Sequence, residues 1–438
     1  MRIYRLSDSQ FLSGKNTLST AICILLLALS SSANSAETSY PDLPPHAQVD
    51  SALDSHLNVL MATTGVKIEE VNQRKWHSGS YEFNLRAGSS QRKIDTSGQA
   101  LAEWDVTLER PLRLPNKMLL DGDIGDEGVN RAEQALGDAH HEAGRALLHL
   151  WFNWQREQAQ ASQWQQQVEI LKQQAATTEK RFKAGDAPRM ELNQAQAAVF
   201  QANVAQQQAK MRAQLAGSEL TRQFPAIQLP PRQTLAIPLP PEHDFAYWKA
   251  KILDHNHELD LAASEKRIQQ MLAQRSRAER IPDPTVGLRY ANEMGGNEKI
   301  TGIYISMPLS YSVRAANAQH AEYMAEIGRD REAAIRRRLE GDIYSAHTQA
   351  ISSYQTWQQA QEAADKLRNN AELVTRAYTL GESSLSETLT SRRLALESTL
   401  AENITQLDAN ETRYRLLLDA HELWPMAEHE EHASGHQH

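Results

Sequence analysis

The chain has 438 residues, a formal net charge of −9 and a pI near 6.0. This acidic balance excludes the basic surface that nucleic-acid-binding proteins need, so no nucleic-acid partner is expected. Only 6% of the residues are aromatic and the mean hydropathy is −0.59, whereas alanine, glutamine, leucine and glutamate are abundant. Such a composition is typical of long exposed helices rather than of one compact core.

Residues 1–36 have the features of a secretory signal peptide. Basic residues precede the apolar run at 21–29, and small residues suited to cleavage follow it. The run is too short to cross a membrane as a stable helix. Because the single cysteine, Cys23, lies inside it, we expect neither a disulfide nor a thiolate metal site in the exported part. With no later apolar run of membrane-spanning length, the exported protein is expected in the periplasm, outside the cell, or in the outer membrane as strands.

Alternating hydrophobicity predicts one β-hairpin in each half of the chain. Residues 81–87 and 101–109 alternate between apolar and polar, and polar residues 88–99 are expected to form the loop between them. Residues 286–290 and 303–307 repeat the pattern around a glycine-containing loop. A wall with one apolar and one charged face fits a barrel between lipid and water, but four strands cannot close a barrel without oligomerisation. The alternative is two surface hairpins on a soluble domain.

Long proline-free segments predict long helices. The intervals between Pro115 and Pro188 and between Pro308 and Pro425 suit helices of about 50 to 60 residues, or roughly 75 to 90 Å. Shorter helices are expected at 53–62 and 253–262. The glycine-rich residues 121–128 are interpreted as a loop that leads into the first long helix, because their spacing lacks the ligands of a calcium loop.

Two turn sequences 196 residues apart interrupt the long helical segments. Each has an aromatic residue, a glycine three positions later and a glutamate six positions after the glycine: Phe182, Gly185 and Glu191 in the first, and Tyr378, Gly381 and Glu387 in the second. The glycines are expected to end one helix and reverse the chain. Ser384 and Glu387 have the spacing of a capping box. An ordinary turn between helices would explain either motif by itself.

Equivalent features recur at offsets of 196 to 200 residues, which indicates an internal duplication. A segment with six prolines separates the copies and is expected to be an extended linker. The predicted domains are a signal peptide at 1–36, a first repeat at 37–223, the linker at 224–243, a second repeat at 244–424 and a histidine-rich tail at 425–438.

The sequence offers no catalytic motif. It has no phosphate-binding loop, dinucleotide fingerprint or metalloprotease motif, so no enzymatic activity is expected. The tail interleaves glutamates with four histidines, His429, His432, His436 and His438, and imidazole with carboxylate suits heavy-metal ions. A solvated tail without a metal role is the alternative.

The duplicated order of helix, β-hairpin and long helical hairpin, with Pro-Leu after each hairpin and glycine in each turn, resembles the TolC-like outer-membrane efflux protein family. The histidine tail is similar to features of its heavy-metal branch. The resemblance implies a mainly α fold with a small β part. In that fold a homotrimer combines four strands per chain into a 12-stranded outer-membrane β-barrel, and its helical hairpins form an α-barrel tunnel in the periplasm.

The resemblance also implies partners and roles. A periplasmic adaptor, an inner-membrane RND pump and outer-membrane lipid would be the partners, with no cofactor and with heavy-metal ions as the cargo. Gly185 and Gly381, with Phe182 and Tyr378, would lie at the periplasmic tip where the adaptor docks, and Tyr378 would help to hold the tip shut.

Glu191 and Glu387 would form the acidic entrance gate. Thr390 replaces the next acidic residue of the family pattern, so the resemblance does not extend to a doubled acidic ring. Stabilisation of their own helix starts is the alternative role for both glutamates. The rival functions are a duct of the same fold for drugs or secreted peptides, or a soluble periplasmic coiled-coil adaptor or metal-binding protein.

Overall fold

The computed structural model of the chain describes residues 40–79, 81–231, 235–309 and 311–424. Contacts divide the chain into two units, Met1–Pro41 and Asp42–His438, and the elements below all belong to the second. The predictions of a signal peptide and of a metal-binding tail fall outside the described residues. No helix within the described ranges is long and apolar enough to cross a membrane.

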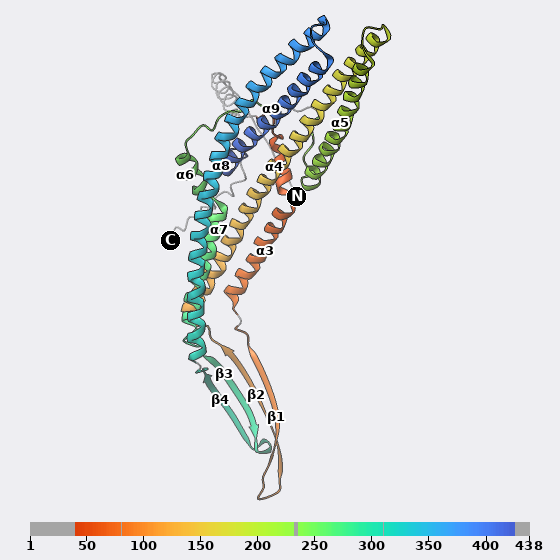
Figure 1. The fold of residues 1–438 in the computed structure, drawn as a ribbon. Coiled ribbons are helices and arrows are strands. Elements are labelled where there is room, and N and C mark those ends of the chain that lie inside the picture. The colour runs from red at the N-terminus through yellow and green to blue at the C-terminus, as the bar shows by residue number, and fades with distance from the viewer. Residues whose placement is uncertain (1–39, 80, 232–234, 310, 425–438) are drawn as a thin grey trace, which may run out of the picture. The chain divides into compact units, whose positions relative to one another are not determined.

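The second unit contains the same series of elements twice (Figure 1). The first series is α2 (His46–Asp54), α3 (Leu57–Ser78), β1 (Asn84–Lys93), β2 (Ala100–Pro111), α4 (Pro115–Lys183) and α5 (Arg189–Gln223). The second is α6 (Phe245–Asp254), α7 (His257–Ala278), β3 (Thr285–Glu293), the 3₁₀ turn η1 (Met294–Gly296), β4 (Glu298–Ser306), α8 (Ser312–Leu380) and α9 (Leu385–Asp419). The three longer pairs of matching helices have equal lengths: 22 residues in α3 and α7, 69 in α4 and α8, and 35 in α5 and α9. The predicted mainly helical fold with a small β part is confirmed.

The four strands form one antiparallel sheet in the order β1-β2-β3-β4. The strands are longer than the alternation predicted, because residues of the expected loop at 88–99 continue the ladder from Gly88 opposite Asp105 to Lys93 opposite Ala100. Only residues 94–99 form the turn. At the other end Tyr81 lies outside the strand, and its hydroxyl donates to Asp283 Oδ2 at 3.0 Å.

The sheet has two distinct faces, because successive side chains point to opposite sides. Leu85, Leu108, Leu288 and Ile303 stand in one row across all four strands, and all four are exposed. We call this side the apolar face. The opposite side, here called the polar face, carries three arginines and five carboxylates: Arg86, Arg92, Arg289, Glu103, Asp105, Glu109, Glu293 and Glu298.

The helices predicted at 53–62 and 253–262 are each broken near their start. The Ser55 hydroxyl donates to the Ser51 carbonyl oxygen at 2.7 Å and ends α2. Asn256 begins α7, because its Oδ1 accepts from the backbone N–H of Leu259 at 3.0 Å. These short polar side chains compete with the helical backbone for hydrogen bonds, so each segment becomes two helices rather than one.

The loop predicted at 121–128 is wrong, since these residues lie inside α4. Gly122, Gly125 and Gly128 recur every three residues and face α3. A Cβ atom on Gly125 would come within 3.1 Å of the Gln73 backbone and 3.3 Å of Trp76. Close helix packing therefore explains the glycines that suggested a loop.

The main core lies where α4 meets α2 and α9. Large buried side chains gather there, including Leu147, Leu148, Trp151, Phe152, Leu407, Leu416 and Leu418. The Trp151 Nε1 donates to the Asp42 carbonyl oxygen at 2.7 Å, and the Tyr414 hydroxyl donates to Asp42 Oδ1 at 2.7 Å. Closer to the helix turns the buried residues are mostly alanines, such as Ala195, Ala202 and Ala209, which let the helices approach closely.

Candidate functional site at the helix turns

The two helix turns have the same backbone hydrogen bonds. In the first, the Gly185 N–H donates to the Phe182 carbonyl oxygen at 3.0 Å and the Asp186 N–H donates to that of Arg181 at 2.8 Å. The second turn repeats both bonds around Gly381, at 3.1 and 2.9 Å. Both glycines have left-handed φ angles, +81° and +79°, as this capping motif requires. Nothing lies within 4 Å of a Cβ built on either, so the backbone conformation alone calls for glycine.

Four side chains near these turns form what we call the tip network: Arg181, Asp186, Glu191 and Tyr378. Arg181 Nη1 donates to the Tyr378 hydroxyl oxygen at 2.7 Å, and the guanidinium lies 5.2 Å from the centre of the tyrosine ring. The Tyr378 hydroxyl donates to Glu191 Oε2 at 3.3 Å. Arg181 Nε also donates to Asp186 Oδ2 at 3.0 Å. The network thus joins α4, the first turn and α5 to α8 of the other repeat.

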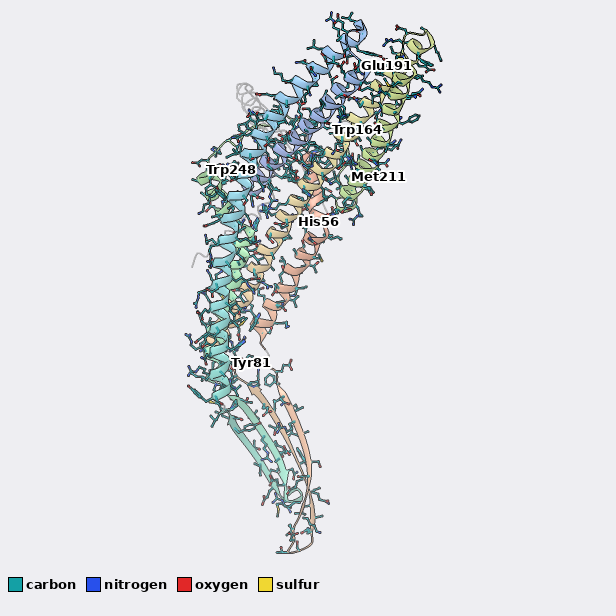
Figure 2. The ribbon with its side chains drawn as sticks, viewed as in Figure 1. His56, Tyr81, Trp164, Glu191, Met211 and Trp248 are labelled. Carbon is teal, nitrogen blue, oxygen red and sulfur yellow. The ribbon has the colours of Figure 1, made fainter. Side chains whose placement is uncertain are left out.

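The ring of Tyr378 is buried, with only 7% of its surface exposed. It packs with Ala195 of α5 and Leu385 of α9, and Ala175 of α4 completes the cluster. Because all four long helices contribute to this cluster, the two helical hairpins of one chain are fastened together close to their turns. Figure 2 shows Glu191 at this end of the helices and Tyr81 at the opposite end, beside the sheet.

The two candidate gate residues occupy different environments. Glu387 serves its own helix, because its Oε2 accepts from the Ser384 backbone N–H at 2.9 Å and from the Ser383 hydroxyl at 2.8 Å. The backbone bond from Ser384, helped by the two hydroxyls, lowers the pKa of Glu387. The predicted capping box is present. Glu191, in contrast, reaches Tyr378 on the other hairpin.

Sequence reasoning missed Arg181 and Asp186. Phe182 and Tyr378 hold the same place in the repeat, but only the tyrosine has a hydroxyl, and the side chain of Phe182 is half-buried. The missed signal was a difference between the copies: Arg181 is matched by Ala377 in the second turn, where no such network can form. A charged residue present in only one of two copies indicates a contact that only that copy makes.

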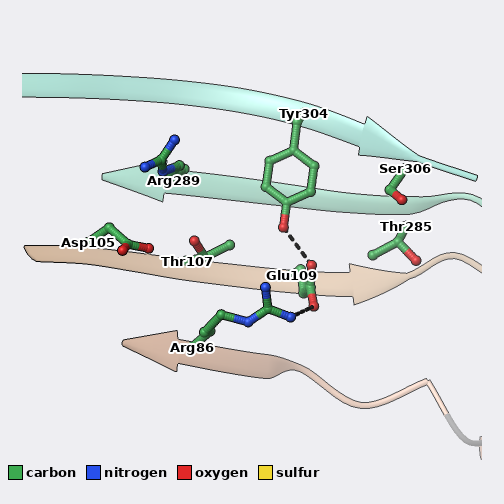
Figure 3. A pocket seen from close by; sticks show the side chains of 8 residues that line it. All are labelled: Arg86, Asp105, Thr107, Glu109, Thr285, Arg289, Tyr304 and Ser306. Carbon is green, nitrogen blue, oxygen red and sulfur yellow. Dashed lines mark hydrogen bonds and ion pairs between the residues drawn. The ribbon is translucent and has the colours of Figure 1, made fainter. Parts of the chain in front are cut away.

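A hollow lies on the polar face, at the far end of the long helices from the turns. It is lined by Arg86, Asp105, Thr107, Glu109, Thr285, Arg289, Tyr304 and Ser306 (Figure 3). The Tyr304 hydroxyl donates to Glu109 Oε2 at 2.5 Å, and Arg86 Nη2 lies 3.8 Å from Glu109 Oε1. In the described part of the chain, no group of three or more histidine, cysteine, aspartate or glutamate side chains is arranged to hold a metal ion.

Residues 78–223 match the family model for outer membrane efflux proteins. This segment of the chain is similar to that family. The matched segment contains the first hairpin, α4, the first turn and α5, so it includes three members of the tip network. This match agrees with the resemblance to outer-membrane efflux proteins that the sequence motifs indicate.

Solved structures share the fold at low sequence identity. The Campylobacter jejuni outer membrane channel CmeC is 15% identical, with 86% of this chain and 85% of that chain covered and a TM-score of 0.70. VceC of Vibrio cholerae is 14% identical over 86% and 99% of the two chains, with a TM-score of 0.69. The open state of the Neisseria gonorrhoeae channel MtrE is 16% identical over 87% and 90%, with a TM-score of 0.63. Comparison with curated protein sequences finds no significant match.

Proposed function

We propose that this protein is the outer-membrane duct of a tripartite efflux system. It passively conducts substrate to the outside from an inner-membrane RND pump and a periplasmic adaptor. The observation that carries the proposal is the two-faced sheet. Leu85, Leu108, Leu288 and Ile303 expose an apolar row suited to lipid, while the opposite face carries charges suited to a water-filled pore.

The duct requires more than one copy of the chain, and we infer a homotrimer. β1 and β4 are the two edges of the sheet, and each leaves a row of backbone hydrogen-bonding groups for a neighbour. Pairing β4 of one copy with β1 of the next closes the wall, and three copies give a 12-stranded barrel. Such closure satisfies the backbone groups that lipid cannot.

The duplication indicates how the helices of neighbouring copies meet. Phe200 and Met211 on α5 are 71% and 53% exposed, whereas Leu396 and Leu407 at the equivalent positions of α9 are 5% and 0% exposed. In one chain α9 packs against both α8 and α4, but α5 packs mainly against α4. We infer that α8 of the next copy covers α5 as α4 covers α9, so that the helices continue around a closed tunnel.

In the proposed duct the helix turns form the inner tip, and the tip network holds it closed. Gly185 and Gly381 shape the two turns on which the adaptor docks. Opening requires the hairpins to separate, which breaks the bonds of Tyr378 to Arg181 and Glu191. The fold is compatible with such a movement, since MtrE has been solved in an open state. Glu191 and Glu387 supply the negative charge at the entrance.

Heavy-metal cations are our proposed cargo. The support comes from the sequence, where four histidines, His429, His432, His436 and His438, follow closely on one another and glutamates flank the first two, a combination that suits such ions. Metal ions would be transient cargo, and no resident cofactor is proposed. A duct for drugs or secreted peptides would have the same fold, but such a cargo would not explain the histidines of the tail.

Growth of a deletion strain tests the proposal. The strain, with and without the intact gene, is grown with copper, silver, zinc, cobalt, nickel and cadmium salts and with detergents and antibiotics. We expect sensitivity to a subset of the metals that the intact gene restores. A second gene lacking residues 425–438 then tests the tail. Sensitivity to drugs alone would keep the duct and reject the metal cargo, and a soluble monomer in the periplasmic fraction would reject the duct.

A further inference from the structure

One carboxylate of the polar face lines the hollow without a partner among the described residues. Asp105, on β2, is half-buried and lines the hollow shown in Figure 3. None of the described residues forms a hydrogen bond or an ion pair with it. An uncompensated carboxylate at a fixed, partly buried position attracts cations more strongly than an exposed one, because less water screens it.

The residues beside Asp105 leave it room and do not neutralise it. Its partners in the sheet register are Gly88 on β1 and Ala291 on β3, neither of which has a polar side chain. A Cβ atom on Gly88 would come within 2.7 Å of Asp105 Oδ1, so the carboxylate occupies the space above this glycine. The Asp105 carboxylate therefore stands between a glycine and an alanine, open to the hollow.

The neighbouring charges already have partners. Arg92 bonds to Glu103 at 2.6 Å and to Glu293 at 2.9 Å. Arg289 lies 3.8 Å from a carboxylate oxygen of Glu293. Arg86 and Tyr304 both engage Glu109. The five carboxylates exceed the three arginines of this face, and Glu298, which also has no partner within the described residues, lies at the exposed end of β4.

We propose that Asp105 is a specificity-determining residue that makes the outer part of the conduit prefer cations to anions. The inference rests on the proposed function, in which the polar face lines the pore of a trimer. Three copies of Asp105 then stand at one level of the wall, where a ring of carboxylates concentrates cations and repels anions. The residue acts on charge alone and needs no metal coordination, so it applies equally to metal ions and to organic cations.

Reversal potentials in planar lipid bilayers test the proposal. Purified full-length protein is inserted into a neutral bilayer with a potassium chloride gradient, and the permeability ratio of K⁺ to Cl⁻ is measured. We expect a cation-selective channel whose ratio falls at least about twofold in Asp105→Asn. Asp105→Glu should keep the ratio of the unchanged protein. Asp95→Asn is the matched control, because it removes the same charge from the exposed turn between β1 and β2, outside the hollow.

Three outcomes separate the possibilities. A ratio unchanged in Asp105→Asn overturns the role of Asp105, and so does an equal fall in Asp95→Asn, which would indicate general surface charge. No conductance from the unchanged protein or from Tyr378→Phe, which removes the bonds that hold the tip closed, contradicts the proposed duct itself. Trimer migration on a gel before heating, recorded for every variant, shows that a changed ratio comes from folded channels.

Discussion

At the scale of single residues, the glycines of the two turns differ from glycines inside the helices. Gly381 has a φ of +79° and open space around it, whereas Gly341, inside α8, also has open space but a helical conformation. Gly381→Ala should therefore lower the free energy of unfolding by about 1 kcal/mol, and Gly341→Ala should raise it by about 0.5–1 kcal/mol.

Denaturant unfolding of purified Gly381→Ala and Gly341→Ala measures the two free-energy changes. The opposite signs are the critical result. Destabilisation by both alanines would mean that surrounding groups, rather than backbone conformation, decide the need for glycine at these positions.

The hydroxyl of Tyr378 is the second residue-scale feature, because it links the two hairpins. Tyr378→Phe removes the bonds to Arg181 and Glu191 and keeps the ring, and Phe182 shows that phenylalanine fits the equivalent place in the first turn. Hydrogen bonds to charged groups are worth about 1.5–3 kcal/mol, so the balance between closed and open tips should shift toward open by at least about tenfold.

Single-channel recordings should show a higher conductance or open probability for Tyr378→Phe than for the unchanged protein. Tyr354→Phe serves as the control, because the Tyr354 hydroxyl bonds to Gln358 one turn away on the same helix. Equal gating in Tyr378→Phe and the unchanged protein would show that the tip network does not hold the duct closed.

Residue patterns in the sequence predicted some of these features and not others. The turn glycines and the capping box of Ser384 and Glu387 follow from local hydrogen bonding, which a sequence carries within a few residues. The bond from Arg181 to Tyr378 joins positions 197 apart in sequence and depends on how the hairpins pack. The glycines within 121–128 were misinterpreted for a related reason, since helix packing and loops both favour glycine.

At the scale of elements, the end of α9 is joined to α4 and α7 by a column of imidazoles. The His141 ring of α4 lies 5.4 Å from that of His421, just after α9, and the His421 ring lies 5.2 Å from that of His257 at the start of α7. Burial, with the nearby Arg145 cation, lowers the pKa of His141 from 6.5 to about 3. The folded protein therefore holds this histidine neutral at pH values where the unfolded chain protonates it.

This difference makes stability depend on pH. Between pH 3 and 6.5 the unfolded chain binds the extra proton, so His141 destabilises the fold by about 1.4 kcal/mol for each pH unit below 6.5. Asp138 acts in the opposite direction, because burial and then Glu142 raise its pKa from 3.8 to about 6 and the folded state binds the proton first. Variants with a single substitution, at His141 or at Asp138, separate the contributions of these two residues to the pH dependence of stability.

Thermal unfolding at pH 7.5 and pH 5 measures the effect. His141→Gln should lose less stability on acidification than the unchanged protein, by about 2 kcal/mol. His320→Gln, which removes an exposed histidine of α8, is the control. The same acid sensitivity in all three would assign the pH dependence to other groups.

Element lengths also show the limits of pattern reading. Proline-free intervals correctly indicated long helices, but α4 and α8 have 69 residues each, more than the expected 50 to 60, because their starts lie directly after the strands. The strands extend beyond the residues that alternate between apolar and polar, because the hydrogen bonds between strands join backbone groups and do not depend on the side chains. Ser55 and Asn256 break the shorter helices through local hydrogen bonds, which hydrophobic spacing does not report.

At the scale of the whole molecule, the exposed stripe of α5 predicts the contact between copies. Met211→Glu places a charge where we expect α8 of the next copy, and burying an unpaired carboxylate in such a contact costs several kcal/mol. The variant should fold as a monomer and form fewer trimers. Gln201→Glu adds the same charge at another exposed position of α5.

Analytical ultracentrifugation in detergent measures the trimer fraction of both variants. A loss of trimer in Met211→Glu alone supports the proposed helix contact. Normal trimers in Met211→Glu would mean that this stripe faces water or the adaptor rather than a second copy.

The equal lengths of α4 and α8 have a consequence for how such a protein can change over time. A straight helix of 69 residues spans about 100 Å, so the two helices set the same distance between the strands and the turns in both repeats. One residue inserted into α4 or α8 alone would rotate the end of that helix by about 100° and break the hydrogen bond between Arg181 and Tyr378. The distance between the sheet and the tip is therefore expected to change only through paired insertions, equal in both repeats and close to multiples of seven residues, which restore the helical phase.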